Sequence, residues 1–273
     1  MVGPTAQLAA LTCYCNAHQR GIFARPFFPE NSTCLFCEWI HFLLAPRKGK
    51  VRDWEVVAQT PDEWMNLLLT QKMTRASLIH KPVNDPKFAD RMTAGFVGGG
   101  GQWLLCVQKQ DHSDFWQAAW QVANRDAPDR RIWRVQYALV EETNQLAADR
   151  PNLSELTAQL AEALVEIEQF AREQKLDGFA DCFAKAQQCL SSPTPFSTVY
   201  HKDIAPEGLL TIEAARLLAA CQAAWVFGGM GSWNDLGFDG AEQLLYQRLS
   251  DHVYNLLNGA ICASVNSSAI PVP

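Results

Sequence analysis

The pattern of hydrophobic and polar positions predicts β-structure between residues 47 and 148. Short apolar runs at WEVVA, ASLIH and QWLLCVQ have the length and composition of strands. In IWRVQYALV the residues Trp133, Val135, Tyr137 and Leu139 alternate with more polar neighbours, which is the period of a half-buried strand. FWQAAWQVAN fits a strand or a helix. These segments predict an antiparallel meander rich in tryptophan.

One helix is expected inside this region, at TPDEWMNLLLTQ. Thr60 is suited to cap its first turn, and Pro61 is tolerated there because the first turn needs no backbone donor. Glu63 stands three residues after Thr60, as in a capping box. The sequence therefore predicts a helix that begins after Thr60.

Residues 149–273 have the pattern of helices. Asn152 and Glu155 form a capping pair, and leucines then recur at steps of three and four residues along one face. Three more helices are expected, the first around Phe179–Leu190, the second from about Thr211 to Phe227 and the third from about Asp239 to Val265. With residues 47–148 as a sheet region, the fold class is α+β: a Trp-rich antiparallel sheet followed by a mainly helical C-terminal half.

Residues 1–46 show no clear period and contain four cysteines and several prolines. We interpret them as an irregular N-terminal arm with short pieces of strand or helix, lying over the rest of the molecule. Cys13 and Cys15, together with Cys34 and Cys37, form two closely spaced pairs, and four sulfur ligands would satisfy tetrahedral Zn²⁺. Buried free thiols are the alternative.

The segment AWVFGGMGSWNDLGF, residues 224–238, connects the last two predicted helices. Gly228 and Gly229 are expected to end one helix with positive φ angles, and Asp239 to cap the next. A phosphate cradle would place such glycines between a strand and a helix, so this context does not favour one.

The side chains of this segment allow two interpretations. Trp233 is expected to pack between the helices, with Asn234 and Asp235 bonded to backbone groups of the turn. Alternatively, Trp233, Asn234 and Asp235 form a binding site for a ligand or partner. The first interpretation makes the loop a structural joint, and we favour it.

The same segment carries a family resemblance. AWVFGGMGSWND, followed by Asp-Gly, a tyrosine-bearing amphipathic helix and a small-residue end, resembles a family of uncharacterised bacterial proteins. The resemblance covers about the last third of the chain. It implies a bacterial, cytoplasmic origin and transfers no activity or catalytic residue.

Composition narrows the possible partners. Hydrophobic residues make up 48% and charged residues 19% of the 273 residues, which is typical of a folded globular protein. The formal net charge is −6, and the sequence contains no basic stripe. We therefore do not expect nucleic acid or anionic membranes as partners. The first basic residue is Arg20, so the start lacks the basic region of a secretory signal, and we expect a cytoplasmic protein.

No motif in the sequence specifies a reaction. H-E-x-x-H and G-x-S-x-G do not occur, and the histidines outside the cysteine-bearing segment stand singly. Two classes of function remain. The first is a protein-binding module, such as an immunity or accessory protein, and it is the one we favour. The second is an enzyme or small-molecule-binding protein with a site at the seam between sheet and helices, with a structural zinc as a further possibility.

Overall fold

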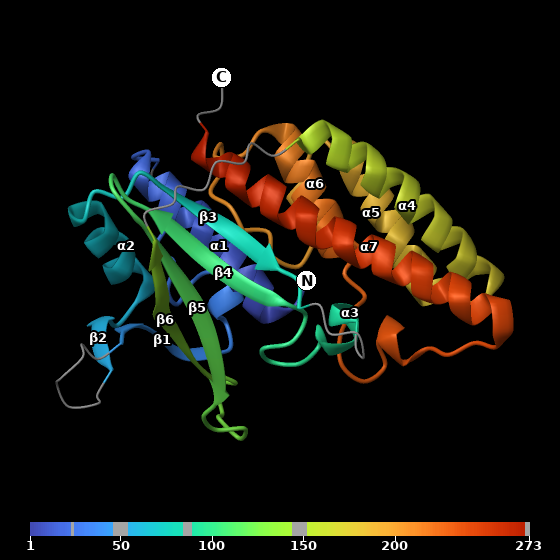
Figure 1. Ribbon diagram of the computed structural model, residues 1–273, viewed down its shortest axis with the longest axis horizontal. Coiled ribbons are helices and arrows are strands. Elements are labelled where there is room, and N and C mark those ends of the chain that lie inside the picture. Colours follow the sequence, from blue (N-terminus) through green and yellow to red (C-terminus); the bar gives the residue numbers. More distant parts are fainter. Residues whose placement is uncertain (23–24, 46–53, 84–88, 144–151, 271–273) are drawn as a thin grey trace.

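The computed structural model of the protein describes residues 1–22, 25–45, 54–83, 89–143 and 152–270. It has an α+β fold in which the strands occupy mostly the N-terminal half and the long helices mostly the C-terminal half (Figure 1). The expected boundaries after residues 46 and 148 lie outside the described residues. In Figure 1 the sheet and the helical half stand side by side.

In the described part of the chain the sheet has six strands, in the order β2-β1-β6-β5-β4-β3. The strands are β1 (Cys37–Leu44), β2 (Glu55–Ala58), β3 (Arg75–Lys81), β4 (Gln102–Gln108), β5 (Ser113–Val122) and β6 (Trp133–Thr143). β3 to β6 form the expected antiparallel meander, and FWQAAWQVAN is a strand. A purely antiparallel sheet was the wrong prediction, because β1 pairs with β6 in parallel. β1 precedes the meander and joins its far edge, so no hairpin sets its direction.

The helices are α1 (Gly3–Gln19), α2 (Pro61–Thr70), α3 (Asp90–Thr93), α4 (Leu153–Glu173), α5 (Asp177–Ser191), α6 (Ile212–Ala223) and α7 (Gly240–Asn266). Short 3₁₀ turns are η1 (Ser32–Cys34), η2 (Pro195–Thr198), η3 (Trp233–Asp235) and η4 (Ser267–Ala269). The predicted caps are confirmed at two helices: Thr60 Oγ1 accepts from the Glu63 amide at 3.2 Å, and Asn152 Oδ1 accepts from the Glu155 amide at 3.1 Å.

Helix α1 corrects the expectation of an irregular N-terminal arm. Its residues from Thr5 to Ala17 are all buried, and it contacts β3, β4 and α7. A helix that is buried all round has no polar face, and therefore no amphipathic period to detect in the sequence. Its polar side chains are used internally: Tyr137 donates to Gln7 Oε1 at 2.8 Å, and Asn16 Nδ2 donates to Ser268 Oγ at 2.7 Å.

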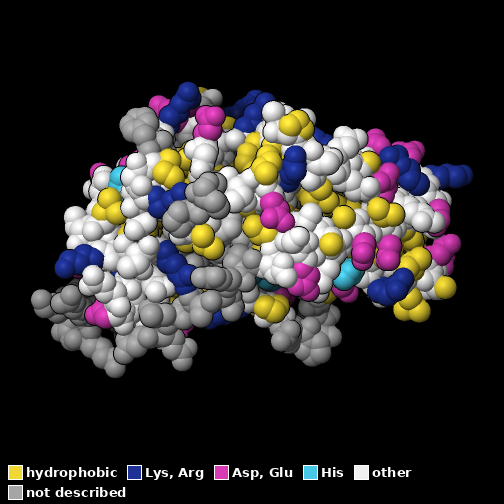
Figure 2. All heavy atoms as spheres, turned by 90° about the horizontal axis from the view of Figure 1, so that it is seen from above, with side chains coloured by type: hydrophobic (Ala, Val, Ile, Leu, Met, Phe, Trp, Pro, Cys, Tyr) yellow, Lys and Arg dark blue, Asp and Glu magenta, His cyan; other side chains and the backbone are white. Residues whose placement is uncertain are grey.

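Acidic and basic side chains are interspersed on the face of the molecule seen in Figure 2, with apolar side chains scattered between them. Among the described residues of that face, neither sign of charge forms a region of its own. Within the described part of the chain, no helix combines the length and the apolar character that crossing a membrane requires.

Candidate functional site

Trp233 is a core residue. Its side chain is 0% exposed, and its ring centroid lies 5.2 Å from that of Phe179, 5.3 Å from that of Phe183 and 5.6 Å from that of Tyr246. Its indole Nε1 donates to Ser250 Oγ at 2.7 Å, which satisfies the one polar atom of the ring. Its ring contacts therefore place Trp233 between α5 and α7, whereas the joint interpretation placed it between the last two helices, α6 and α7.

The two polar residues after Trp233 also bond within the protein. Asn234 is buried, and its Nδ2 donates to the Arg91 backbone oxygen at 2.6 Å. Asp235 Oδ2 accepts from the Gly231 amide at 2.5 Å. A ligand-binding role for Trp233, Asn234 and Asp235 stays an untested prediction, and none of the three lines the pocket described below.

Two details of this loop were predicted wrongly. Gly231 and Gly240 have positive φ angles of 79° and 56°, whereas Gly228 and Gly229 do not. Asp239 is the N-cap residue of α7 but makes no side-chain capping bond. Gly228 is instead approached by Gly95, where an added Cβ would lie 2.1 Å from the Gly228 carbonyl carbon. The glycines here allow close backbone contact between two loops.

The four cysteines of the predicted zinc site occupy three elements. Cys13 and Cys15 are two residues apart on α1 and so point in roughly opposite directions around the helix. Gln7 Nε2 lies 4.0 Å from Cys34 Sγ and 3.5 Å from Cys37 Sγ. Burial raises the pKa of Cys37 to about 11, which keeps it a thiol. Across the described residues, no group of three or more His, Cys, Asp or Glu is placed to hold a metal ion, and zinc binding stays an untested prediction.

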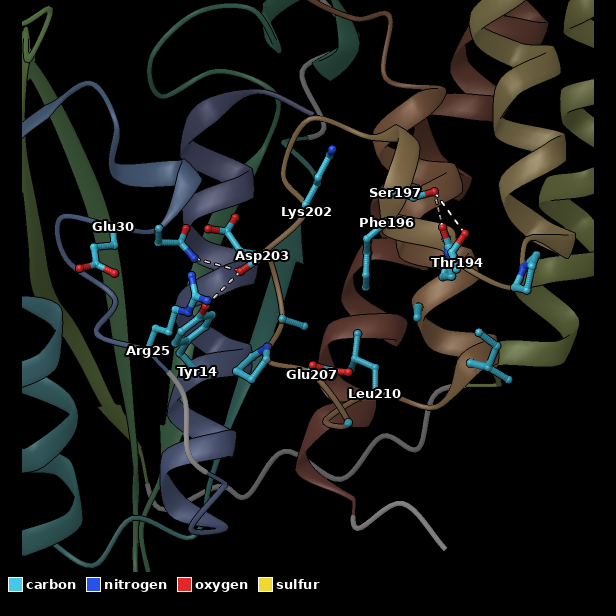
Figure 3. Close-up of a pocket in the computed structure, with 18 of the residues that line it drawn as sticks. Tyr14, Arg25, Glu30, Thr194, Phe196, Ser197, Lys202, Asp203, Glu207 and Leu210 are labelled. Atoms are coloured by element: carbon cyan, nitrogen blue, oxygen red, sulfur yellow. Dashed lines mark hydrogen bonds between the residues drawn. The ribbon is translucent and has the colours of Figure 1, made fainter.

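A pocket of about 900 Å³ lies where the loop before η1 meets the segment that connects α5 to α6 (Figure 3). One wall is polar and is formed by Tyr14, Arg25, Glu30, Asn31 and Asp203. The wall facing it comes from residues 193–197 and 205–215. The pocket volume is in the range of sites that enclose small organic ligands.

The second wall is mainly apolar. Its apolar side chains are Pro193, Pro195, Phe196, Ala205, Pro206, Leu210, Ile212 and Ala215. In Figure 3 Phe196 and Leu210 lie opposite the group formed by Tyr14, Arg25 and Asp203. Thr194 and Ser197 add two hydroxyl groups, whose oxygens are 3.3 Å apart. The pocket therefore has apolar surface on one side and charged or hydrogen-bonding groups on the other.

Residues 201–203 are tied to η1 by a latch that we define as Ser32, His201 and Asp203. Of these three residues, Asp203 lines the pocket, on its polar wall. Ser32 Oγ donates to Asp203 Oδ1, and the Ser32 amide donates to Asp203 Oδ2 at 2.9 Å. Ser32 Oγ also lies 2.9 Å from His201 Nδ1. From α6, Gln222 Oε1 accepts from the His201 amide at 3.2 Å. These bonds fix residues 201–203 against η1.

The latch contains the residue types of a serine-hydrolase triad in a different order. In a triad, serine donates to histidine, and histidine donates to the carboxylate. Here the carboxylate of Asp203 bonds Ser32 directly. Burial, reinforced by the nearby N-terminal amino group, lowers the pKa of His201 to about 4. The geometry thus matches a structural hydrogen-bond network better than an activated nucleophile.

Sequence reasoning missed the pocket, because the two segments that line it, residues 14–31 and 193–215, are more than 160 residues apart in the sequence. The proline-containing stretches PFFPENST and SSPTP were the available signal, since each breaks regular structure beside the pocket. Comparisons with protein-family models, curated proteins and solved structures find no significant match to the chain. The candidate site therefore rests on the geometry of this chain alone.

Proposed function

We propose that the protein binds a small organic ligand in the pocket between the loop before η1 and the α5–α6 connection. The observation that carries this proposal is the pocket of about 900 Å³, which has an apolar wall opposite a polar one. Such sites combine apolar surface, which supplies affinity, with a few polar groups, which supply orientation. This is the second of the two functions considered from the sequence.

The rigidity of the walls supports the proposal. The latch holds Asp203 on the polar side, and Asn31 Nδ2 donates to the Asp203 backbone oxygen at 3.0 Å. Four prolines line the pocket, and each has a restricted backbone. A pocket with fixed walls loses little conformational entropy when a ligand enters, so more of the contact energy appears as affinity.

The test is to block the pocket without disturbing the core. Ile212 lines the pocket at the start of α6 and is 49% exposed, so Ile212→Trp should fill space and leave the fold intact. Leu244→Trp on α7 is the matched control, because Leu244 is 69% exposed and does not line the pocket. Ligand-detected NMR with a mixed small-molecule library should find binders of the wild type and of Leu244→Trp that Ile212→Trp does not bind. Equal binding by both variants, or no binder at all, would contradict the proposal.

Protein binding remains a second candidate, and one surface favours it. We define the loop-tip patch as Phe96, Val97 and Met230. Phe96 is 66% and Met230 102% exposed, and the backbone contact of Gly95 with Gly228 brings the two loops together. Exposed apolar groups on adjacent loops are typical of interaction surfaces.

This second candidate is tested by affinity capture from a lysate of the source organism. A specific partner should bind the wild type and a Leu244→Asp control, and should be lost with Phe96→Asp or Met230→Asp. Identical capture by all four proteins would show that the loop-tip patch is not the binding surface.

A further inference from the structure

We infer that the ligand of this pocket is a short peptide with free termini and an apolar side chain. This inference rests on the proposed function and specifies the chemistry of the same site. It follows from three properties of the pocket: an available cation, an available carboxylate and an apolar wall with room for more than one residue.

The available cation is Arg25. It lines the polar wall, is exposed, and makes no ion pair with another described residue. Figure 3 places Arg25 beside Tyr14, whereas Lys202 extends away from that group. A guanidinium can bind both oxygens of a carboxylate at once, so Arg25 is suited to a peptide C-terminus.

The available carboxylate is Glu207. Asp203 has its carboxylate occupied by Ser32, and Glu30 lies at the far side of Arg25 in Figure 3. Glu207 stands near Leu210 in the same view, and it too makes no ion pair with another described residue. A carboxylate on the segment that carries the apolar wall is suited to the ammonium group of a peptide N-terminus.

The apolar wall accounts for the side chain. Phe196, Leu210 and Ile212 offer aliphatic and aromatic surface in the same pocket as these two charges, and burial of a leucine-sized group against it favours binding. The hydroxyl groups of Thr194 and Ser197 can exchange hydrogen bonds with peptide amides. A ligand with charge of only one sign would form an ion pair with only one of Arg25 and Glu207.

The experiment measures binding of the dipeptide Ala-Leu by isothermal titration calorimetry. N-acetyl-Ala-Leu lacks the ammonium group, and Ala-Leu-amide lacks the carboxylate. The wild type should bind Ala-Leu about tenfold more tightly than either blocked form, a ratio that corresponds to about 1.4 kcal/mol. Arg25→Gln should bind Ala-Leu and its amide equally, and Glu207→Gln should bind Ala-Leu and its N-acetyl form equally.

Two control variants test whether the effects are specific to charges in the pocket. Arg125→Gln and Glu242→Gln remove exposed charges outside the pocket and should keep the wild-type preferences. Blocked forms that bind as well as Ala-Leu, preferences that survive in both pocket variants, or no binding of Ala-Leu to the wild type would each overturn the inference. If an uncharged library compound still binds the wild type and not Ile212→Trp, the proposed function stands while the peptide inference fails.

Discussion

The helical half contains two long connections between helices. One of them leaves a pocket open, and the other fills the space between helices with its own side chain. The α5–α6 connection covers residues 192–211, and the α6–α7 connection covers residues 224–239. The second places Trp233 between α5 and α7, where its side chain is fully buried. The first contributes three prolines and small residues to a wall that leaves about 900 Å³ open. The α6–α7 connection is rich in aromatic residues and glycines and therefore stands out in the sequence. In the structure, however, its aromatic ring occupies the space that a ligand would need.

The two connections also differ in whether their polar groups are bonded within the protein. Around Trp233 the polar atoms bond one another: Tyr246 donates to the Trp233 backbone oxygen at 2.5 Å, and Ser250 accepts from the indole. In the α5–α6 connection, Asp203 bonds across to η1, whereas Lys202 and Glu207 form no ion pair with described residues. The α6–α7 connection is therefore internally satisfied, and the α5–α6 connection has charges available to a ligand.

The largest expected effect concerns Trp233. Trp233→Ala should lower the free energy of unfolding by about 3–5 kcal/mol, because it leaves a large cavity among Phe179, Phe183 and Tyr246 and also leaves Ser250 without the indole donor. Chemical denaturation would measure it. A loss below about 1 kcal/mol, together with lost ligand or partner binding, would instead make Trp233 a binding residue.

The next largest effect is the pH dependence of the unfolding free energy that His201 causes. Its pKa is about 4 in the folded protein and about 6.5 when unfolded, so the unfolded state binds more protons between these values. The unfolding free energy should therefore fall as the pH drops from 6.5 to 4, by on the order of 2–3 kcal/mol from this group, and be unaffected above pH 7. His201→Gln should show a flatter pH profile in urea titrations. Parallel profiles would show that His201 is not buried in its neutral form.

A smaller effect separates two glycines at the contact between the loops. Gly95→Ala should destabilise the protein by about 1–3 kcal/mol, because its Cβ would overlap the Gly228 backbone. Gly228→Ala should change stability by less than about 1 kcal/mol, since its Cβ would meet Ser232 Cβ at an ordinary 3.5 Å and its φ is not positive. Thermal melts of both variants would measure this difference, and the reverse order would contradict the described loop contact.

The smallest effect is expected at Asp235, which is exposed and accepts one hydrogen bond from Gly231. Asp235→Asn should lower stability by less than about 1 kcal/mol, because an amide oxygen can accept the same bond. Differential scanning calorimetry can resolve the shift in Tm. A loss comparable with that of Trp233→Ala would mean that the carboxylate charge itself holds the loop.

Sequence reasoning succeeded where the structure is determined locally. Thr60 and Asn152 cap helices in the structure as their positions predict, since capping depends on residues two or three positions apart. The burial of Trp233 also followed from its immediate neighbours, but its contact with α5 did not, because the sequence placed it between the last two helices. β-Strands with alternating residues, such as β6, were found for the same reason.

Features that depend on distant segments were missed. Helix α1 has no polar face, so its pattern did not distinguish it from irregular structure. The parallel pairing of β1 with β6 joins strands that are about 96 residues apart, and strand direction is not encoded in either segment. The pocket forms only when the loop that carries Arg25 meets the segment that carries Phe196. None of the residue types that line the pocket marks a site in the sequence. Only tertiary packing brings these residues together.

The burial of α1 also constrains the order in which the protein can fold. Asn16 bonds Ser268 across 252 residues of sequence, and its Nδ2 also donates to the Ala76 backbone oxygen at 2.9 Å. During synthesis α1 emerges before the elements that surround it, and these surroundings are incomplete until the ribosome has made α7 and η4. Contacts of such long range are formed late and slow the search for the native state. A nascent chain that ends before Ser268 should therefore expose the apolar surface of α1, which makes this helix the segment most in need of protection while the chain grows.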